Sequence, residues 1–252
     1  MPMFKNIEGL QDYNIVMPET RPPGLSAMIR VKDEAEYLER SVESIINWMD
    51  EVVICLQGEQ SDRSSIIAET LANKYPDKIM VYCYPFNSFP NGPGHDKQKL
   101  NSAYERAYFY NWCLSKTTRQ YVCKWDGDMI ALDGAGVQIR EQLGTVGFMC
   151  LTGSEMVSET HQSIKPFTAC EPRIFKVTDE TYYITGSHCE ILNPKCLSRK
   201  HKIFPGHQFK HFKWAKSQAS ISKAWPENWE EIHHFQGLMK RKQQGQEYAG
   251  PK

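Results

Sequence analysis

The chain has 252 residues, a length that suits one large α/β domain or two small ones. Lysine plus arginine and aspartate plus glutamate both total 30, and this zero formal net charge argues against a general nucleic-acid-binding protein. A hydrophobic content of 40% with 12% aromatic residues fits a packed globule and excludes a disordered chain.

The cysteines and the apolar runs indicate in which cellular compartment the protein is expected. None of the 8 cysteines forms a Cys-x-x-Cys pair, so a zinc site has little support. Cys55, Cys83, Cys123 and Cys150 fall in apolar strand-like runs, as small buried residues do in a reducing compartment. No apolar run approaches about 18 residues, and the N-terminus lacks a signal pattern. We therefore expect a soluble cytoplasmic protein, with peripheral membrane contact left open.

The first third of the chain alternates strands and helices after an irregular, proline-rich segment at 1–24. The expected elements are a strand at 25–31, a helix at about 34–49, a strand at 51–56, a helix that Ser61 or Asp62 caps and that ends near 74, and a strand at 78–84. This β-α-β-α-β order implies a parallel, right-handed, three-layer α/β/α arrangement. Ligands gather at the carboxyl ends of the strands in such sheets.

The remainder of the chain is less regular. Residues 86–99 predict a loop in which His95, Lys97 and Lys99 either contact phosphates or are simply solvated. The elements expected beyond it are a helix at 100–116, a strand from 121, a short helix at 135–143, a strand at 145–152, strand-like segments within 164–177 and 182–192, and helices near 213–223 and 227–243.

A short apolar strand runs into two acids separated by one glycine, Asp126-Gly127-Asp128. Alternation along an extended chain points both carboxylates to one side. Two hard oxygen donors suit Mg²⁺ or Mn²⁺, and the glycine lets a bulky ligand approach the backbone. The alternative interpretation is a plain turn after a strand, because aspartate and glycine are common in turns.

Several separated segments resemble one family, the family 2 glycosyltransferases. Residues 26–44 resemble its opening strand and helix, residues 52–64 occupy the place of its Asp-rich loop, and Asp126-Gly127-Asp128 occupies the place of its Asp-x-Asp. Three later segments resemble the branch that adds sugars to lipopolysaccharide core or capsule: Arg173-Ile174-Phe175-Lys176, His188-Cys189-Glu190 and His211-Phe212-Lys213-Trp214. The resemblance covers roughly residues 25–215.

The resemblance implies a GT-A fold, a three-layer α/β/α structure with a mostly parallel central sheet. It places a nucleotide-sugar-binding half at 25–134, an acceptor-binding half at 135–215 and a helical extension at 216–252. It also implies a nucleotide-sugar donor, a saccharide or glycolipid acceptor, Mn²⁺ or Mg²⁺ as cofactor and inversion at the sugar carbon. The sequence departs from the family at Leu56 and Gln57, which replace an acid that holds the base, and at Asp33, which replaces asparagine.

The resemblance also suggests roles for individual residues. Donor binding is expected of Arg30, Asp33, Glu34, Gln57, Asp62, Lys97, Asp126, Gly127 and Arg173. The metal is expected at Asp128 and Asp126, with Asp126 shared with the ribose, and His211 either completes the coordination or is structural. Arg173 either grips a diphosphate or pairs with a neighbouring acid.

The attacking hydroxyl group needs a carboxylate base, and Glu190 is the first candidate, followed by Glu171. The alternative for either is an ion pair with Arg173 or a lysine. Trp214, Trp225 and Trp229 either stack on sugar rings or pack in a helical core.

The expected function is metal-dependent transfer of a hexose-like sugar in surface polysaccharide or glycan synthesis. A sugar-nucleotidyltransferase would need a glycine-rich phosphate loop after the first strand, and residues 30–34 contain no glycine. A non-catalytic sugar-nucleotide-binding module is supported only by Gln57.

Overall fold

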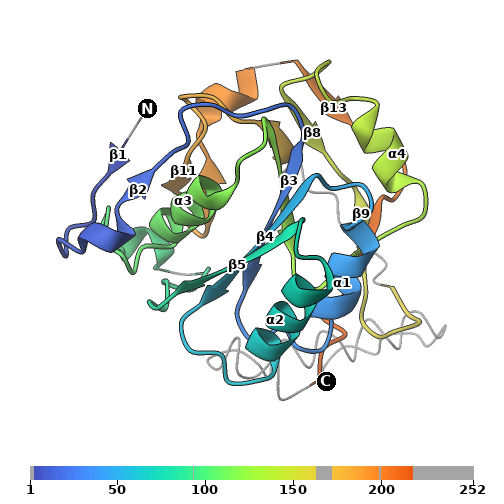
Figure 1. The fold of residues 1–252 in the computed structure, drawn as a ribbon, viewed down its shortest axis with the longest axis horizontal. Coiled ribbons are helices and arrows are strands. Elements are labelled where there is room, and N and C mark those ends of the chain that lie inside the picture. The colour runs from blue at the N-terminus through green and yellow to red at the C-terminus, as the bar shows by residue number, and fades with distance from the viewer. Residues whose placement is uncertain (1–2, 93, 163–171, 199, 218–252) are drawn as a thin grey trace, which may run out of the picture.

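The structure is a computed structural model that describes residues 3–92, 94–162, 172–198 and 200–217. Its centre is a seven-stranded sheet in the order β13-β8-β10-β6-β3-β4-β5 (Figure 1). The strands of this sheet are β3 (Leu25–Val31), β4 (Glu51–Gln57), β5 (Ile79–Tyr84), β6 (Tyr121–Asp126), β8 (Phe148–Cys150), β10 (Pro172–Lys176) and β13 (His201–Ile203).

Four neighbouring strands of this sheet, β6, β3, β4 and β5, are mutually parallel. β10 runs antiparallel to both β6 and β8, and β13 runs parallel to β8. The mostly parallel sheet predicted from the alternation of elements is therefore confirmed. Because Arg30 pairs in register with Asp126 and Val31 with Leu56, the carboxyl ends of β3, β4 and β6 form one edge.

Helices cover both faces of the sheet (Figure 1). α1 (Leu38–Ile45) and α2 (Ser64–Lys74) pack on one face, where Ile29 of β3 and Trp125 of β6 are buried. α3 (Arg106–Lys116) packs on the other face, against Met28 and Val122. This alternation along β3 and β6 is what a doubly covered sheet requires, and it produces the three layers that the sequence predicts.

The smaller elements flank the central sheet. They are β1 (Met3–Phe4), η1 (Gln11–Tyr13), β2 (Ile15–Val16), η2 (His95–Lys97), β7 (Met129–Ala131), α4 (Ala135–Arg140), β9 (Gly153–Glu155), β11 (Tyr183–Thr185), β12 (Glu190–Leu192), η3 (Pro194–Ser198) and β14 (Phe209–His211). β14 lies between β7 and β9, with His211 in register with Met129 and Glu155. This pairing brings a late segment of the chain next to Asp128.

Three helices are shorter than predicted, and one of them, α4, ends at Arg140 instead of residue 143. α1 begins at Leu38 instead of near residue 34, because Asp33 has a φ of 55° and residues 34–37 form turns. α3 begins at Arg106 instead of residue 100, because Asn101 has a φ of 60° and its N–H donates to the Glu105 carboxylate. The helix predicted at 227–243 lies outside the described residues, and so do residues 218–223 of the one before it. The described residues of that earlier helix, 213–217, form a turn and a bend, so the prediction is wrong there.

Two further expectations need correction. Residues 1–24 are not wholly irregular, because β1 and β2 pair antiparallel, with Met3 opposite Val16. Cys83 is exposed on β5, whereas Cys55, Cys123 and Cys150 are buried as expected. In the part of the chain that the structure describes, no helix has both the length and the apolar character needed to cross a bilayer.

Candidate active site

The acid pair lies where the carboxyl edge of the parallel strands meets the β3–α1 loop. Asp126 is the last residue of β6, and Gly127 and Asp128 form the turn into β7. Ser41 of α1 fixes this turn, since its hydroxyl donates to the Asp126 carbonyl at 3.0 Å. A Cβ on Gly127 would lie 3.2 Å from the Glu34 side chain. Glycine therefore permits the close approach of Glu34 to the acid pair.

Two arginines hold the carboxylate of Asp126. Arg30 from the adjacent strand β3 pairs with Oδ1, and Nη1 of Arg173 on β10 lies 2.6 Å from Oδ2. Burial alone would raise the pKa of Asp126, but Arg173 and Arg30 hold it well below its usual range. Both oxygens therefore stay ionised and paired. Arg173 therefore pairs with a neighbouring acid in this structure, and its contact with a diphosphate stays a prediction.

Asp128 has different partners, although the alternation of an extended chain would give both acids the same surroundings. Its Oδ1 lies 3.1 Å from Nε2 of His211, and its Oδ2 lies 2.6 Å from Nζ of Lys216. The same Lys216 ammonium lies 2.6 Å from Oε2 of Glu34. The reason is that β6 ends at Asp126, so the alternation does not continue through the turn.

His211 lies between two carboxylates. Its Nδ1 is 2.9 Å from Oε1 of Glu155, which lies opposite it on β9. Burial by itself would lower the pKa of His211, but Asp128 and Glu155 raise it to about 9. The ring is then an imidazolium at neutral pH. His211 would have to lose a proton before it could bind a metal as predicted.

The donor atoms at this edge suit a hard divalent cation, yet they are not arranged around one. Within residues 3–92, 94–162, 172–198 and 200–217, no three His, Cys, Asp or Glu side chains form a metal-binding group. The ammonium of Lys216 lies between the carboxylates of Glu34 and Asp128 instead. Burial, together with the nearby Asp128 and Asp126, raises the pKa of Glu34 to about 8. Oxygen ligands of this kind fit Mg²⁺ or Mn²⁺ once the ammonium leaves.

Asp33 and Asp62 connect the β3–α1 loop to the β4–α2 loop. Oδ1 of Asp33 accepts from the Ser61 N–H at 2.6 Å. Asp62 accepts from the Ala35 N–H at 2.9 Å and from the Ser64 N–H at 2.8 Å. The N-cap residue of α2 is Arg63, so the cap predicted at Ser61 or Asp62 is wrong, although Asp62 binds the first N–H of the helix. Both acids therefore shape the edge beside the acid pair, and their oxygens are engaged by the backbone.

The loop after β5 lies against the β11–β12 turn. His95 is fully buried, and its Nδ1 lies 3.3 Å from the Gly186 carbonyl. The Gly92 N–H donates to the His188 carbonyl at 2.8 Å. This burial gives His95 a structural environment, whereas Lys97 is exposed in η2.

Glu190 lies in a buried ionic cluster on the α3 face of the sheet. Its carboxylate is 3.0 Å from Nε of Arg106 and 3.2 Å from Nζ of Lys124. Burial would raise its pKa, but Lys124, Arg106 and Arg30 lower it to about 2. A carboxylate held this way suits a structural ion pair, because a base needs a pKa nearer the working pH. Glu171, the other candidate base, lies outside the described residues.

Sequence reasoning missed Lys124, Arg106, Glu155 and Lys216. Lys124 could have been found, since it is a charged residue two positions before Asp126 in an otherwise apolar strand and so shares its face. Arg106, Glu155 and Lys216 reach the site through tertiary contacts that no local spacing indicates. Gln57 is the last residue of β4 and is buried, and its role in donor binding stays a prediction.

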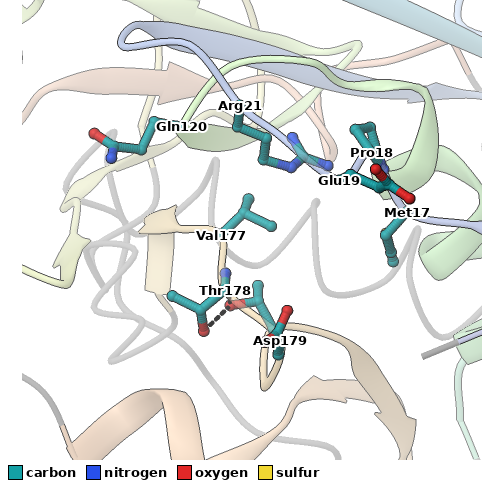
Figure 2. Close-up of a pocket in the computed structure, with 9 residues that line it drawn as sticks. Met17, Pro18, Glu19, Arg21, Gln120, Val177, Thr178 and Asp179 are labelled. Carbon is teal, nitrogen blue, oxygen red and sulfur yellow. Dashed lines mark hydrogen bonds between the residues drawn. The ribbon is translucent and has the colours of Figure 1, made fainter. Parts of the chain in front are cut away.

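A cavity of about 280 Å³ lies at the opposite end of the strands (Figure 2). Its lining includes Arg21, Gln120 just before β6, and Val177 just after β10. With about 3.3 Å per residue, the length of β6 separates this cavity from Asp126 by roughly 20 Å. The cavity is therefore separate from the acid pair.

The sequence of the first half of the chain matches a known protein family. Residues 12–131, just under half of the chain, match the beta-1,4-N-acetylgalactosaminyltransferase (CgtA) family. The matched part ends just past Asp126-Gly127-Asp128. No curated protein sequence matches the chain.

A solved structure shares the fold. The mannosyltransferase PcManGT from Pyrobaculum calidifontis, in complex with GDP-Man and Mn²⁺, is 12% identical with a TM-score of 0.51, over 94% of this chain and 68% of that one. Glucosyl-3-phosphoglycerate synthase from Mycobacterium tuberculosis is 16% identical over 55% of this chain and 47% of that one, and its TM-score of 0.35 is too low to support an argument.

The sheet topology and the family match together define a glycosyltransferase with the GT-A fold. The fold and the enzyme class expected from the resemblance to family 2 are therefore confirmed.

Proposed function

We propose that the protein transfers a sugar from a nucleotide-sugar donor to a hydroxyl group of a saccharide or glycolipid acceptor, with inversion at the sugar carbon and with Mn²⁺ or Mg²⁺ at Asp128. The observation that carries the proposal is the cation-binding pair of Glu34 and Asp128 at the carboxyl edge of a GT-A sheet. The pathway proposed is surface polysaccharide or glycan synthesis in the cytoplasm.

The sugar proposed for the first test is N-acetylgalactosamine, because the matched family carries that name. A mannose donor comes second, since the structure with the same fold was solved with GDP-Man. Gln57 replaces the acid expected at the end of the second strand, so both uridine and guanosine diphosphate derivatives belong in the panel.

When bound, the divalent cation acts as a Lewis acid for the growing negative charge of the departing diphosphate. Asp128 and Glu34 are proposed to hold it. Asp126 is proposed to accept hydrogen bonds from the ribose, because Arg30 and Arg173 keep its carboxylate ionised and oriented. Once the donor is bound, the two arginines also lie beside the acid pair with positive charge to offer the diphosphate.

The proposed base is Glu171, which lies outside the described residues. Glu190 becomes the second candidate, because Lys124 and Arg106 lower its pKa to about 2. Glu171→Gln is expected to bind the donor normally and to lose transfer, whereas full transfer by this variant would remove Glu171 from the mechanism.

Thermal unfolding with a panel of nucleoside diphosphates and their sugar derivatives, with and without Mn²⁺, tests the proposal. We expect a nucleoside diphosphate to raise the midpoint of unfolding only when Mn²⁺ is present. Stabilisation by a nucleoside triphosphate with release of pyrophosphate would favour a sugar-nucleotidyltransferase. Binding of a nucleotide-sugar without turnover on any acceptor would favour a non-catalytic module.

A further inference from the structure

Residues 212–217, named here the 212–217 segment, lie against the β3–α1 loop immediately after β14. Phe212 stacks on Tyr37 with ring centroids 4.8 Å apart. The hydroxyl group of Ser217 donates to Glu36 at 2.7 Å. Between these two contacts, Lys216 reaches Glu34. The segment is therefore attached to residues 34–37 along its length, and it lies beside the acid pair.

The ammonium group of Lys216 is bound as a cation by two carboxylates from different parts of the chain. It lies 2.6 Å from Oε2 of Glu34 and 2.6 Å from Oδ2 of Asp128, and its side chain is 7% exposed. A buried ammonium is unfavourable unless carboxylates compensate it, so these contacts fix its position. The place between Glu34 and Asp128 is thus a binding site for one positive charge.

A divalent cation would need the same oxygens, because Asp126 cannot supply its own without breaking its pairs with Arg30 and Arg173. Oxygen ligands lie about 2.0–2.1 Å from Mg²⁺, so an ammonium at hydrogen-bond distance from both carboxylates occupies the space that the ion needs. Lys216 and the metal therefore exclude each other.

We propose that Glu34 and Asp128 together form the divalent-cation site, and that Lys216 occupies this site in the metal-free protein. Metal binding expels Lys216 and releases the 212–217 segment from the β3–α1 loop. The inference rests on the proposed function only in assigning the cation to sugar transfer. It adds to that function the competition between Lys216 and the metal, and it gives the segment after β14 a role in metal binding.

Competition lowers the apparent metal affinity by the fraction of molecules in which Lys216 has left the site. Lys216→Met removes the charge and keeps most of the side-chain length, so Mn²⁺ should bind at least about tenfold more tightly. Lys216→Arg keeps the charge and serves as the matched control, with an affinity near that of the wild type. In the Lys216→Met background, Glu34→Gln should weaken Mn²⁺ binding at least about tenfold, because a ligand is lost and no competitor remains.

Mn²⁺ binding to the full chain is measured by the loss of the free-ion electron paramagnetic resonance signal, without nucleotide. Equal or weaker binding by Lys216→Met would overturn the proposal, as would an unchanged affinity on adding Glu34→Gln. Failure of every protein to bind Mn²⁺ would overturn it too. Circular dichroism checks that each variant is folded.

A second measurement does not depend on changing Lys216. Trp214 lies within the 212–217 segment, so addition of diamagnetic Mg²⁺ to the wild type should change its fluorescence, and Trp214→Phe should lose that change. No difference between the two proteins would contradict release of the segment. Failure of sugar transfer in a protein that shows the Mn²⁺ competition would count against the proposed function alone.

Discussion

Asp126 and Asp128 are two positions apart and differ in electrostatic surroundings. Asp126 is held by two arginines, whereas Asp128 is held by His211 and Lys216. An arginine is always charged, so the pairs of Asp126 persist at any working pH. An ammonium can be exchanged for a metal ion at the same oxygens. In the proposed function, this difference in partners makes Asp126 the orienting carboxylate and Asp128 the cation-binding one.

Asp128→Asn tests this division at the level of one residue. The amide keeps the size of the side chain but is a weaker metal ligand, so metal-linked binding of nucleoside diphosphate should weaken at least about tenfold. Titration calorimetry with and without Mn²⁺ measures the effect. Asp133 is an exposed acid a few residues later, so Asp133→Asn is the matched control and should leave the binding unchanged.

Glu190 predicts a pH dependence of stability. Its folded pKa of about 2 lies below the usual value of 4.5, so its contribution is complete above the usual value and is lost as the pH falls through the folded value. The difference in free energy of unfolding between wild type and Glu190→Gln should therefore shrink as the pH falls from about 5 towards about 2. Urea unfolding measures it. A difference in free energy of unfolding that does not change with pH would contradict the ion pairs of Glu190 with Arg106 and Lys124. The control is Glu141→Gln, because Glu141 is exposed.

At the level of elements, the position of β14 between β7 and β9 brings His211 next to Asp128. It has three residues, and its partners β7 and β9 are equally short. Such short strands leave no periodic signal, and their pairing is non-local. The sequence segment His211-Phe212-Lys213-Trp214 was singled out by resemblance, but its position beside Asp128 follows only from the register of β14 on β7.

Gly153 on β9 allows the ring of Phe209 on β14 to pack closely against the backbone of β9. A Cβ at this position would lie 2.4 Å from the ring of Phe209 on β14. Gly153→Ala should therefore destabilise the protein by about 1–3 kcal/mol and weaken metal-linked nucleotide binding, since β14 carries His211. Thermal and urea unfolding measure the loss of stability.

The compensating substitution is Phe209→Leu, which removes the ring that the new methyl group would meet. In this background, Gly153→Ala should cost less stability than it does in the wild type. Purely additive effects of the two substitutions would show that the contact between β9 and β14 does not carry the destabilisation.

For the whole molecule, the strands predicted best are β3, β4, β5 and β6. Each is an apolar run alternating with helices, and this pattern alone fixes a parallel sheet and the edge where ligands gather. The acid pair at the end of β6 was therefore placed correctly at that edge. The fold class of the protein could be predicted because the alternation of strands and helices is a local signal that any α/β domain contains.

The contacts within the site could not be predicted in the same way. Helix periodicity suggested that α1 starts four residues early, because the pattern does not show the φ of 55° at Asp33. The antiparallel insertion of β10 beside β6 brings Arg173 to Asp126, and no spacing along the chain indicates it. The pairing of Lys216 with Glu34 joins residues that are far apart in the sequence and depends on the complete fold.

The central claim is that the Asp128 edge of the sheet supports metal-dependent sugar transfer. The most direct measurement is release of nucleoside diphosphate from nucleotide-sugars, N-acetylgalactosamine donors first, with saccharide and glycolipid acceptors and with Mn²⁺ or a chelator. The account predicts acceptor-dependent release that stops on chelation and returns with added Mn²⁺, and that Asp128→Asn abolishes. Release that persists at full rate in the chelator, or in Asp128→Asn, would contradict it.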